Sequence, residues 1–403
     1  MRSAIVLVVD RLGAGFLGPY GNTWVDTPEL NRLASQSVLV ESAIADTPQL
    51  ELLYRSYWHG THALRAVTAA APLLPALPAA AADIPATLLT DDRQLATIDW
   101  GKAFRQRIAV SAAPASAPAN GVEETQLGQF FAAALDWLSQ SQPPFLLWLH
   151  ARGMAGEWDA PPEFRERFRD EDDPPPPQWI EPPDRQLARD YDPDELLGVT
   201  HAYAGQLAAL DTCVGALLDA ITESPALRDA LLVLTSPRGY ALGEHGRIGP
   251  CGDELHGEVL HTPLLLRFPD GRHAGERVQA LAQPGDIYPT VLEWLGVPLP
   301  APADWGHSLL EIATRPWLRD GACSSVFGQR SIRTPVWFLR ETEAGNALYA
   351  KPDDRWEVNE IGNLCPEVVS ELSAAIHQFA QSAESGQLAV LPRLSPLARE
   401  GIG

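Results

Sequence analysis

The sequence predicts an α/β protein with a doubly wound, mostly parallel sheet and a small C-terminal antiparallel α+β subdomain. Over residues 1–315, short apolar runs alternate with longer segments in which apolar residues recur at three- and four-residue spacing. This alternation is typical of βαβ units. Beyond about residue 318, several short runs precede a single helical pattern. We therefore expect a main domain at 1–315, a subdomain at 316–385 and a tail at 386–403.

The individual elements follow from these patterns. Strands of the main domain are expected at residues 5–9, 86–90, 145–149, 231–235 and 264–268. Its helices are expected at 29–36, 127–139 and 200–222, where the spacing places apolar residues on one helical face. The C-terminal sheet is expected at 326–327, 333–339 and 347–350, with a covering helix at 366–382.

Two segments interrupt the alternation. Residues 66–86 are rich in Ala and Pro, and we interpret them as a surface excursion. Residues 163–194 surround four consecutive prolines with acidic residues, a composition that favours extended polyproline conformations. We interpret this second segment as a solvated connection, with a partner-binding strap as the alternative.

Composition limits the classes of partner. The chain has 403 residues, 45% of them hydrophobic, so it can bury a large core. Its formal net charge of −22 argues against nucleic acid or an anionic membrane as partner, because both require a basic surface. The four cysteines are irregularly spaced and form no Cys-x-x-Cys pair, so we predict neither a zinc site nor a disulfide framework.

The N-terminal apolar run at residues 5–9 is shorter than the roughly 7–15 residues of a signal-peptide core, and it is needed as the first strand. No stretch approaches the ~20 apolar residues of a membrane span. With Met1 as the start of the chain, we expect a cytoplasmic protein.

Polar residues follow two of the predicted strands. Asp10 and Arg11 follow the run at 5–9, and Pro237 and Arg238 come soon after the run at 231–235. The carboxyl ends of parallel strands are where ligands bind in open α/β sheets. We expect these four residues to lie at the functional site.

The motifs around these positions occur throughout the chain. They are VVDRL at 8–12, LGPYGN at 17–22, TPELNRLA at 27–34, AIA at 43–45, PPFLLWLH at 143–150, GYALGEHG at 239–246, HTPLLLRFP at 261–269, DIYPT at 286–290, IRTP at 332–335 and LYAKPDD at 348–354. Their order resembles the sulfatase family of the alkaline phosphatase superfamily. The resemblance spans nearly the whole chain and implies the fold of that superfamily.

The resemblance also implies a metal site, and this chain lacks most of it. In the family, the first strand ends in two acidic residues, and a later strand supplies an aspartate followed by Asn or His. The matching positions here are Asp10, Arg11, Pro237 and Arg238. One ligand remains where calcium takes about six to eight. We therefore predict no metal and no other cofactor.

The two arginines have two interpretations. In the first, Arg11 and Arg238 hold Asp10 in bidentate hydrogen bonds and take the place of the cation, as a structural cluster. In the second, the same arginines line an anion pocket. We favour the structural cluster over the pocket.

The family's nucleophile is replaced as well. The family carries a cysteine or serine in a Cys/Ser-x-Pro/Ala-x-Arg motif, and Leu50 occupies the nucleophile position here. Leu50 has no lone pair with which to attack sulfur or phosphorus. Tyr54 stands at the motif arginine, with Arg55 one residue away.

Residues that contact the substrate in the family are changed too. By resemblance, Ala155 replaces a histidine and Pro250 replaces a lysine, whereas His150 keeps a family-like position. His150 is interpreted either as a hydrogen-bonded residue at a strand end or as a functional group. The candidate anion-binding set is Arg11, Arg55, Arg238 and His150. The histidines and acidic residues at 245–261 repeat no known ligand pattern, so no new metal centre is predicted.

Nucleophile, metal ligands and substrate contacts are lost together while the scaffold motifs remain. We therefore predict a non-catalytic pseudo-sulfatase with a binding or regulatory role, its partner an anionic small molecule or a protein. The alternatives are a sulfuric or phosphoric ester hydrolase with a rearranged active site, and a structural or assembly subunit. A cluster of carboxylates or imidazoles at the strand ends, besides Asp10, would favour the hydrolase.

Overall fold

The computed structural model describes residues 2–67, 72–112, 114–300, 305–315, 317–387 and 390–401. The chain forms two compact units that alternate along the sequence. Unit 1 comprises Met1–Leu39, Asp83–Cys251 and Pro263–Glu276, and unit 2 comprises Val40–Ala82, Gly252–Thr262 and Arg277–Gly403. These two units are defined by spatial packing, and each combines separate stretches of the sequence. The predicted domain boundaries at residues 315 and 385 stay a prediction.

Unit 1 is built on a mostly parallel sheet, as predicted. Its strand order is β11-β7-β1-β5-β3-β4. The strands are β1 (Ala4–Val9), β3 (Ala86–Thr90), β4 (Gln106–Ala109), β5 (Leu146–Ala151), β7 (Leu231–Thr235) and β11 (Leu264–Arg267). Only β11 runs antiparallel to its neighbour β7. All five strands predicted for the main domain are confirmed to within a few residues.

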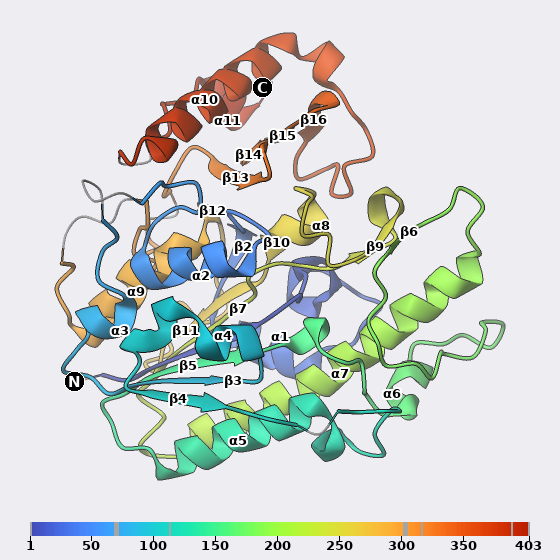
Figure 1. Ribbon diagram of the computed structural model, residues 1–403, viewed down its shortest axis with the longest axis vertical. Coiled ribbons are helices and arrows are strands. Elements are labelled where there is room, and N and C mark those ends of the chain that lie inside the picture. The colour runs from blue at the N-terminus through green and yellow to red at the C-terminus, as the bar shows by residue number, and fades with distance from the viewer. Residues whose placement is uncertain are drawn as a thin grey trace. The chain divides into compact units, whose positions relative to one another are not determined.

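Helices cover the sheet of unit 1. The long helices α5 (Gln126–Gln140) and α7 (Pro193–Glu223) pack against each other, and α1 (Pro28–Ser35) packs on α7 (Figure 1). The side chain of Asp211 on α7 accepts hydrogen bonds from the amides of Glu29 (3.1 Å) and Leu30 (2.8 Å), which satisfies the first turn of α1. The three predicted helices are confirmed.

Helix α7 is long and apolar enough to cross a membrane by length and composition alone, so the expectation that no stretch approaches a membrane span was wrong for this segment. Its most apolar stretch is 78% buried within the fold, as expected for a core helix. The strands β1 and β7 are buried along their whole length, which is characteristic of central strands covered on both faces.

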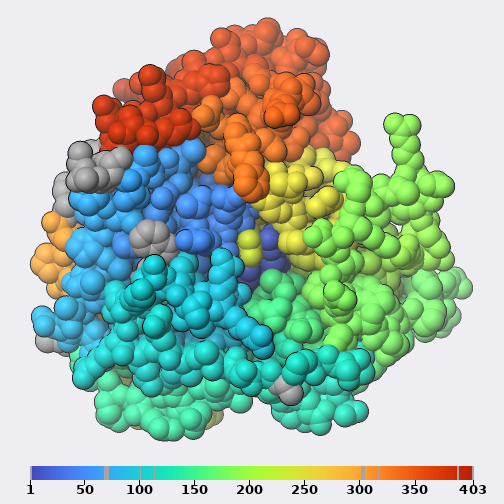
Figure 2. Space-filling model, viewed as in Figure 1, coloured from blue at the N-terminus to red at the C-terminus, as the bar shows by residue number. Residues whose placement is uncertain are grey.

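The acidic, proline-rich segment lies at the surface of unit 1 (light green in Figure 2). Arg165 holds this segment in place. Its buried guanidinium donates hydrogen bonds to the carbonyl oxygens of Trp158, Pro177 and Trp179 (3.0 Å for Trp179). The segment is therefore a connection that is held in place at Pro177. The shorter elements of unit 1 are α4 (Arg93–Thr97), α6 (Pro162–Glu166) and a small sheet of β6 (Arg185–Gln186), β9 (Arg247–Gly249) and β8 (Ala241–Leu242).

The strand β2 (Val38–Ile44) begins in unit 1 and continues in unit 2. In unit 2 it pairs with β10 (His261–Thr262) and β12 (Arg277–Ala282). The helices of this part are α2 (Leu50–His59), α3 (Leu77–Ala80), α8 (Gly257–Leu260) and α9 (Ile287–Leu295). Residues 68–71 of the predicted Ala/Pro-rich excursion lie outside the described residues.

The C-terminal antiparallel sheet is confirmed within unit 2, but two of its predicted strands are placed wrongly: 326–327 falls at the end of one strand and in the turn after it, and 333–339 spans the end of one strand, a turn and the start of the next. It consists of β13 (Ala322–Val326), β14 (Gln329–Arg333), β15 (Trp337–Thr342) and β16 (Gly345–Ala350), in that order. The predicted covering helix is α10 (Pro366–Glu384), which packs on β14 and β15 (Figure 1). A short helix, α11 (Pro396–Glu400), lies in the segment predicted as a tail, and its Ala398 is buried in the core of the subdomain.

A buried ion pair anchors unit 2. Both carboxylate oxygens of Asp286 accept hydrogen bonds from Arg319, at 2.6 and 2.7 Å, and both side chains are almost fully buried. The same carboxylate accepts the amides of Gln283 and His307. Every strong acceptor site of this carboxylate is thus used.

We predict that Arg319→Ala destabilises the protein by about 3–5 kcal/mol, because it leaves the Asp286 carboxylate buried without its partner. The matched control is Arg315→Ala, which removes an exposed pair with Glu311 and is expected to change stability little. Urea unfolding of both variants provides the measurement. Equal stability of the two variants would contradict the prediction.

Candidate functional site

The site begins where β1 ends. The amide of Asp10 donates to the carbonyl oxygen of Ala151 at 2.9 Å, and the carbonyl oxygen of Asp10 accepts from the amide of Met154 at 2.9 Å. Asp10 itself is buried. These backbone bonds hold its carboxylate at the carboxyl edge of the sheet, between β5 and β7.

Arg238 binds that carboxylate with two hydrogen bonds. Its Nε lies 3.0 Å from Asp10 Oδ1, and its Nη2 lies 2.9 Å from Oδ2. Burial by itself raises the pKa of Asp10, but the charge and hydrogen bonds of Arg238, with a further contribution from Arg11, lower it to about 2. The carboxylate is therefore ionised and neutralised at neutral pH.

Arg11 serves a different purpose from the one predicted. Its guanidinium donates to the carbonyl oxygens of Gly239 (3.1 Å) and Pro250, and only its backbone amide contacts Asp10, at 2.9 Å from Oδ1. Arg11 lies in the turn after β1, in a left-handed conformation with φ 64°. The bidentate cluster predicted for both arginines is thus formed by Arg238 alone.

A cavity of about 740 Å³ opens above these residues within unit 1. Four of the predicted positions line it: Arg11, Ala155, Arg238 and Pro250. Arg152 and Tyr240 line it as well, together with the acidic side chains Glu157, Glu181 and Asp184. Burial, followed by the charge of Arg238, lowers the pKa of Arg11 to about 9.

Two further predicted positions lie beside this cavity. His150 is buried near the end of β5, and burial lowers its pKa. Pro237 is buried in the turn after β7, where the hydroxyl of Ser236 donates to the carbonyl oxygen of Arg238 at 2.8 Å. Pro237 offers no side-chain donor or acceptor, so it shapes the turn that presents Arg238.

The predicted nucleophile region belongs to unit 2. Leu50 is the first residue of α2 and is buried, and Tyr54 packs edge-on against Trp58 with ring centroids 4.7 Å apart. Arg55, a candidate anion-binding residue, donates to the carbonyl oxygen of Ala63. Leu50 and Tyr54 therefore act as core residues of this unit.

The hydroxyl of Ser56, on the same helix, donates to Asp46 Oδ2 at 2.6 Å, and the amide of Ala63 donates to the same oxygen at 2.9 Å. Both Ser56 and Asp46 are fully buried, and burial raises the pKa of Asp46. This carboxyl holds the turn after α2 in place. A reacting substrate has no access to a hydroxyl buried in this way.

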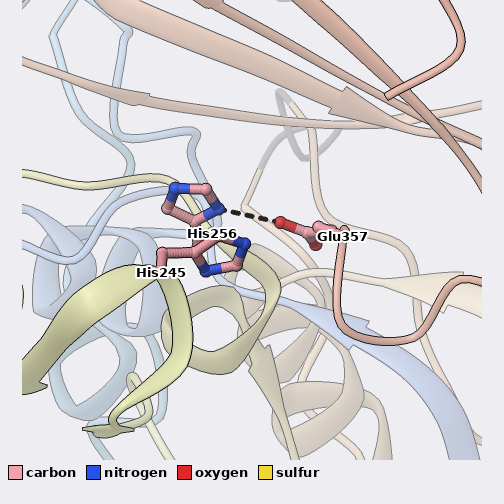
Figure 3. Close-up of side chains that lie close together, drawn as sticks. All are labelled: His245, His256 and Glu357. Atoms are coloured by element: carbon pink, nitrogen blue, oxygen red, sulfur yellow. Dashed lines mark hydrogen bonds and ion pairs between the residues drawn. The ribbon is translucent and has the colours of Figure 1, made fainter. Parts of the chain in front are cut away.

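Another buried polar cluster lies in unit 2. Glu357 Oε2 lies 3.0 Å from His256 Nδ1 (Figure 3), and Glu357 Oε1 accepts from Lys351 at 3.1 Å. Burial opposes ionisation of Glu357, but the hydrogen bond of His256 and the charge of Lys351 lower its pKa. The cluster ties the loop after β16 to the start of α8.

Sequence reasoning missed a second group at the carboxyl edge of unit 1. Asp91 and Asp92 follow β3, and Arg152 follows β5. Together with Glu157 they line a second cavity of about 450 Å³. The signal was present in the sequence, because Asp91 follows the predicted strand 86–90 as Asp10 follows 5–9.

Comparisons with known proteins place these features in a family. The family model described as Sulfatase matches residues 92–297, about half of the chain. The chain is 27% identical over 219 residues to the multifunctional alkaline phosphatase superfamily protein PehA of Trinickia caryophylli and 24% identical over 220 residues to arylsulfatase K of Canis lupus familiaris. These matches cover 50% and 46% of this chain and 40% of each relative.

Solved structures share the fold across the whole chain. The phosphonate monoester hydrolase of Agrobacterium radiobacter superposes with a TM-score of 0.73 at 18% identity, covering 96% of each chain. The phosphonate monoester hydrolase SpPMH of Silicibacter pomeroyi superposes with a TM-score of 0.72 at 18% identity, covering 98% of this chain and 97% of that one. Together with the family-model match, this identifies the chain as a member of the sulfatase family, with an alkaline phosphatase-like fold.

Proposed function

We propose that this sulfatase-family protein binds a small anionic molecule in the 740 Å³ cavity of unit 1 and does not hydrolyse esters by the family's metal-dependent route. One observation carries the proposal. The guanidinium of Arg238 occupies both oxygens of Asp10, the one metal-ligand position that the chain keeps.

The residues at this position do not fit a divalent cation. A metal would have to displace Arg238 from Asp10, and it would then face two guanidinium groups. Each unit charge at ~4 Å from a divalent ion costs about 8 kcal/mol at an effective dielectric of 20. One carboxylate does not offset such repulsion, so no step of the function is assigned to a metal.

The same charges suit an anion. Arg11 is buried at the cavity wall, and its Nε has no hydrogen-bond partner among the described residues. Its guanidinium is held by backbone carbonyls instead of a carboxylate, so its charge stays available to the cavity. The cavity volume lies in the range of small-molecule sites, roughly 300–1,000 Å³. An open cavity also favours a ligand-binding protein over a structural subunit, in which side chains would fill this space.

A hydrolase with a rearranged centre is the second candidate. Asp91 favours it, because burial raises the pKa of this carboxyl to about 7, which suits a general base at neutral pH. The candidate lacks a nucleophile from the chain at Leu50 and would need water in that role. Hydrolysis of aryl sulfates or phosphates by the purified protein, lost on Asp91→Asn, would establish it.

We predict that the purified protein carries no stoichiometric calcium or magnesium, and that chelators leave its Tm unchanged, because Arg238 saturates Asp10. Elemental analysis and a thermal scan with and without EDTA measure this. One equivalent of metal that disappears in Asp10→Ala would contradict the prediction.

The Asp10–Arg238 pair also predicts a pH dependence of stability. The folded-state pKa of Asp10 is lowered from 3.8 to about 2, so its contribution is complete above about pH 4 and is lost as the pH falls toward 2. The loss should be about 2 kcal/mol in the free energy of unfolding. Urea unfolding at several pH values between about 4 and 2 compares the wild type with Asp10→Asn. The free energy of unfolding of the variant should depend less on pH. Parallel curves would show that the pair does not titrate this way.

Anion binding is tested by thermal shift. Millimolar inorganic phosphate or sulfate should raise the Tm of the wild type, and the increase should be absent in Arg11→Met. Arg315→Met, which removes an exposed arginine of unit 2, is the control and should respond like the wild type. A wild-type Tm that both anions leave unchanged would sink the proposed function.

A further inference from the structure

The two cavities of unit 1 lie along one edge of its sheet. In the register of the strands, Val8 and Thr90 flank His150 on either side of β5. Asp10 and Asp91 therefore leave the sheet at nearly the same level, two strand spacings or about 10 Å apart. Arg152 and Glu157 line both cavities and form an ion pair of 3.3 Å between them. The cavities are thus neighbouring compartments that share one wall.

The two compartments differ in the charged group that has no ion-pair partner among the described residues: it is Arg11 in the first cavity, which also holds Glu157, Glu181 and Asp184, and Asp91 in the second. Arg11 and Arg238 line the first cavity. In the second, Asp91 Oδ1 accepts the amide of Arg152 at 2.7 Å, and no side chain of the described residues donates a hydrogen bond to this carboxyl. Asp91 lines the cavity, and among the residues that the structure describes no lysine or arginine forms an ion pair with it.

The other charged groups around Asp91 are Asp92, Arg93, Arg152 and Glu157. Asp92 accepts the amide of Leu95 at 2.7 Å as the cap of α4, and Arg152 is paired with Glu157. Arg93 is exposed on the first turn of α4. Burial raises the pKa of Asp91 to about 7 although the amide and the charge of Arg152 oppose this. This carboxyl therefore lacks a cationic partner, and a ligand can supply one.

We propose that the Asp91 cavity is an ammonium subsite, and that the ligand of this protein is an amine-bearing anion. Its phosphate or sulfate group would lie at Arg11, and its ammonium group would lie at Asp91, on the other side of the Arg152–Glu157 pair. The anionic half rests on the proposed function, whereas the ammonium half rests on Asp91 alone.

The experiment is calorimetric titration of the full-length protein with matched probes. Ethyl phosphate carries only the anion, propylammonium carries only the amine, and aminoalkyl phosphates with about two to about six carbons carry both at increasing separation. We expect the best aminoalkyl phosphate to bind about tenfold more tightly than ethyl phosphate, the gain of one charge-assisted hydrogen bond. Asp91→Asn should remove this advantage, and Asp229→Asn, an exposed carboxylate outside both cavities, should keep it.

The pH dependence gives a second test, which does not depend on a variant that folds. The ammonium group requires ionised Asp91, so the advantage of the aminoalkyl phosphate should increase as the pH rises through about 7 and level off above it. An advantage that falls with rising pH would mean that the ammonium group does not pair with ionised Asp91, and it would overturn the ammonium subsite.

The outcomes separate the two proposals. Equal affinity of ethyl phosphate and all aminoalkyl phosphates in the wild type, or an advantage that survives Asp91→Asn, overturns the ammonium subsite and leaves the proposed function intact. Absence of phosphate binding by any probe overturns the proposed function and the amine-bearing anion with it. In that case, propylammonium binding that is lost in Asp91→Asn would still support the subsite.

Discussion

The two hydrogen bonds between Arg238 and Asp10 are the interaction on which the site depends. They join the residues that follow β1 and β7, two parallel neighbours in the centre of the sheet. A lone carboxylate at this depth would be costly, and a guanidinium provides charge and geometry for both of its oxygens. The carboxyl edge of the sheet therefore stays ordered by the protein's own cation.

Buried arginines also hold loops of unit 1 in place through backbone carbonyl oxygens. Arg11 binds the carbonyl oxygens of Gly239 and Pro250, and Arg165 binds those of Trp158, Pro177 and Trp179. Each guanidinium organises a loop through backbone acceptors and keeps its charge without a paired carboxylate. For Arg11, this places local positive charge in a chain whose formal net charge is −22. Such a local field can attract an anion that the overall charge would repel.

The chain keeps the scaffold of the family, while residues at several positions that resemble the family's site differ. The parallel sheet, its helices and the C-terminal subdomain match solved hydrolases over nearly their whole length. The position that resembles the family's nucleophile holds Leu50, which is buried as the first residue of α2. A fold supports many functions because the site, and not the sheet, defines the reaction. The function of this chain therefore depends on the charged groups at the strand ends.

Local periodicity and turn residues were enough to predict the main strands, the long helices and the presence of a C-terminal antiparallel sheet. The motifs around Arg11, Arg238 and Leu50 also marked these residues as candidate site residues. Only the tertiary structure decided that Arg238 binds Asp10 while Arg11 turns to the carbonyl oxygens of Gly239 and Pro250. It also brought Asp91 to the same edge. Side-chain direction and strand order depend on residues more than 50 positions apart, and no local pattern encodes such contacts.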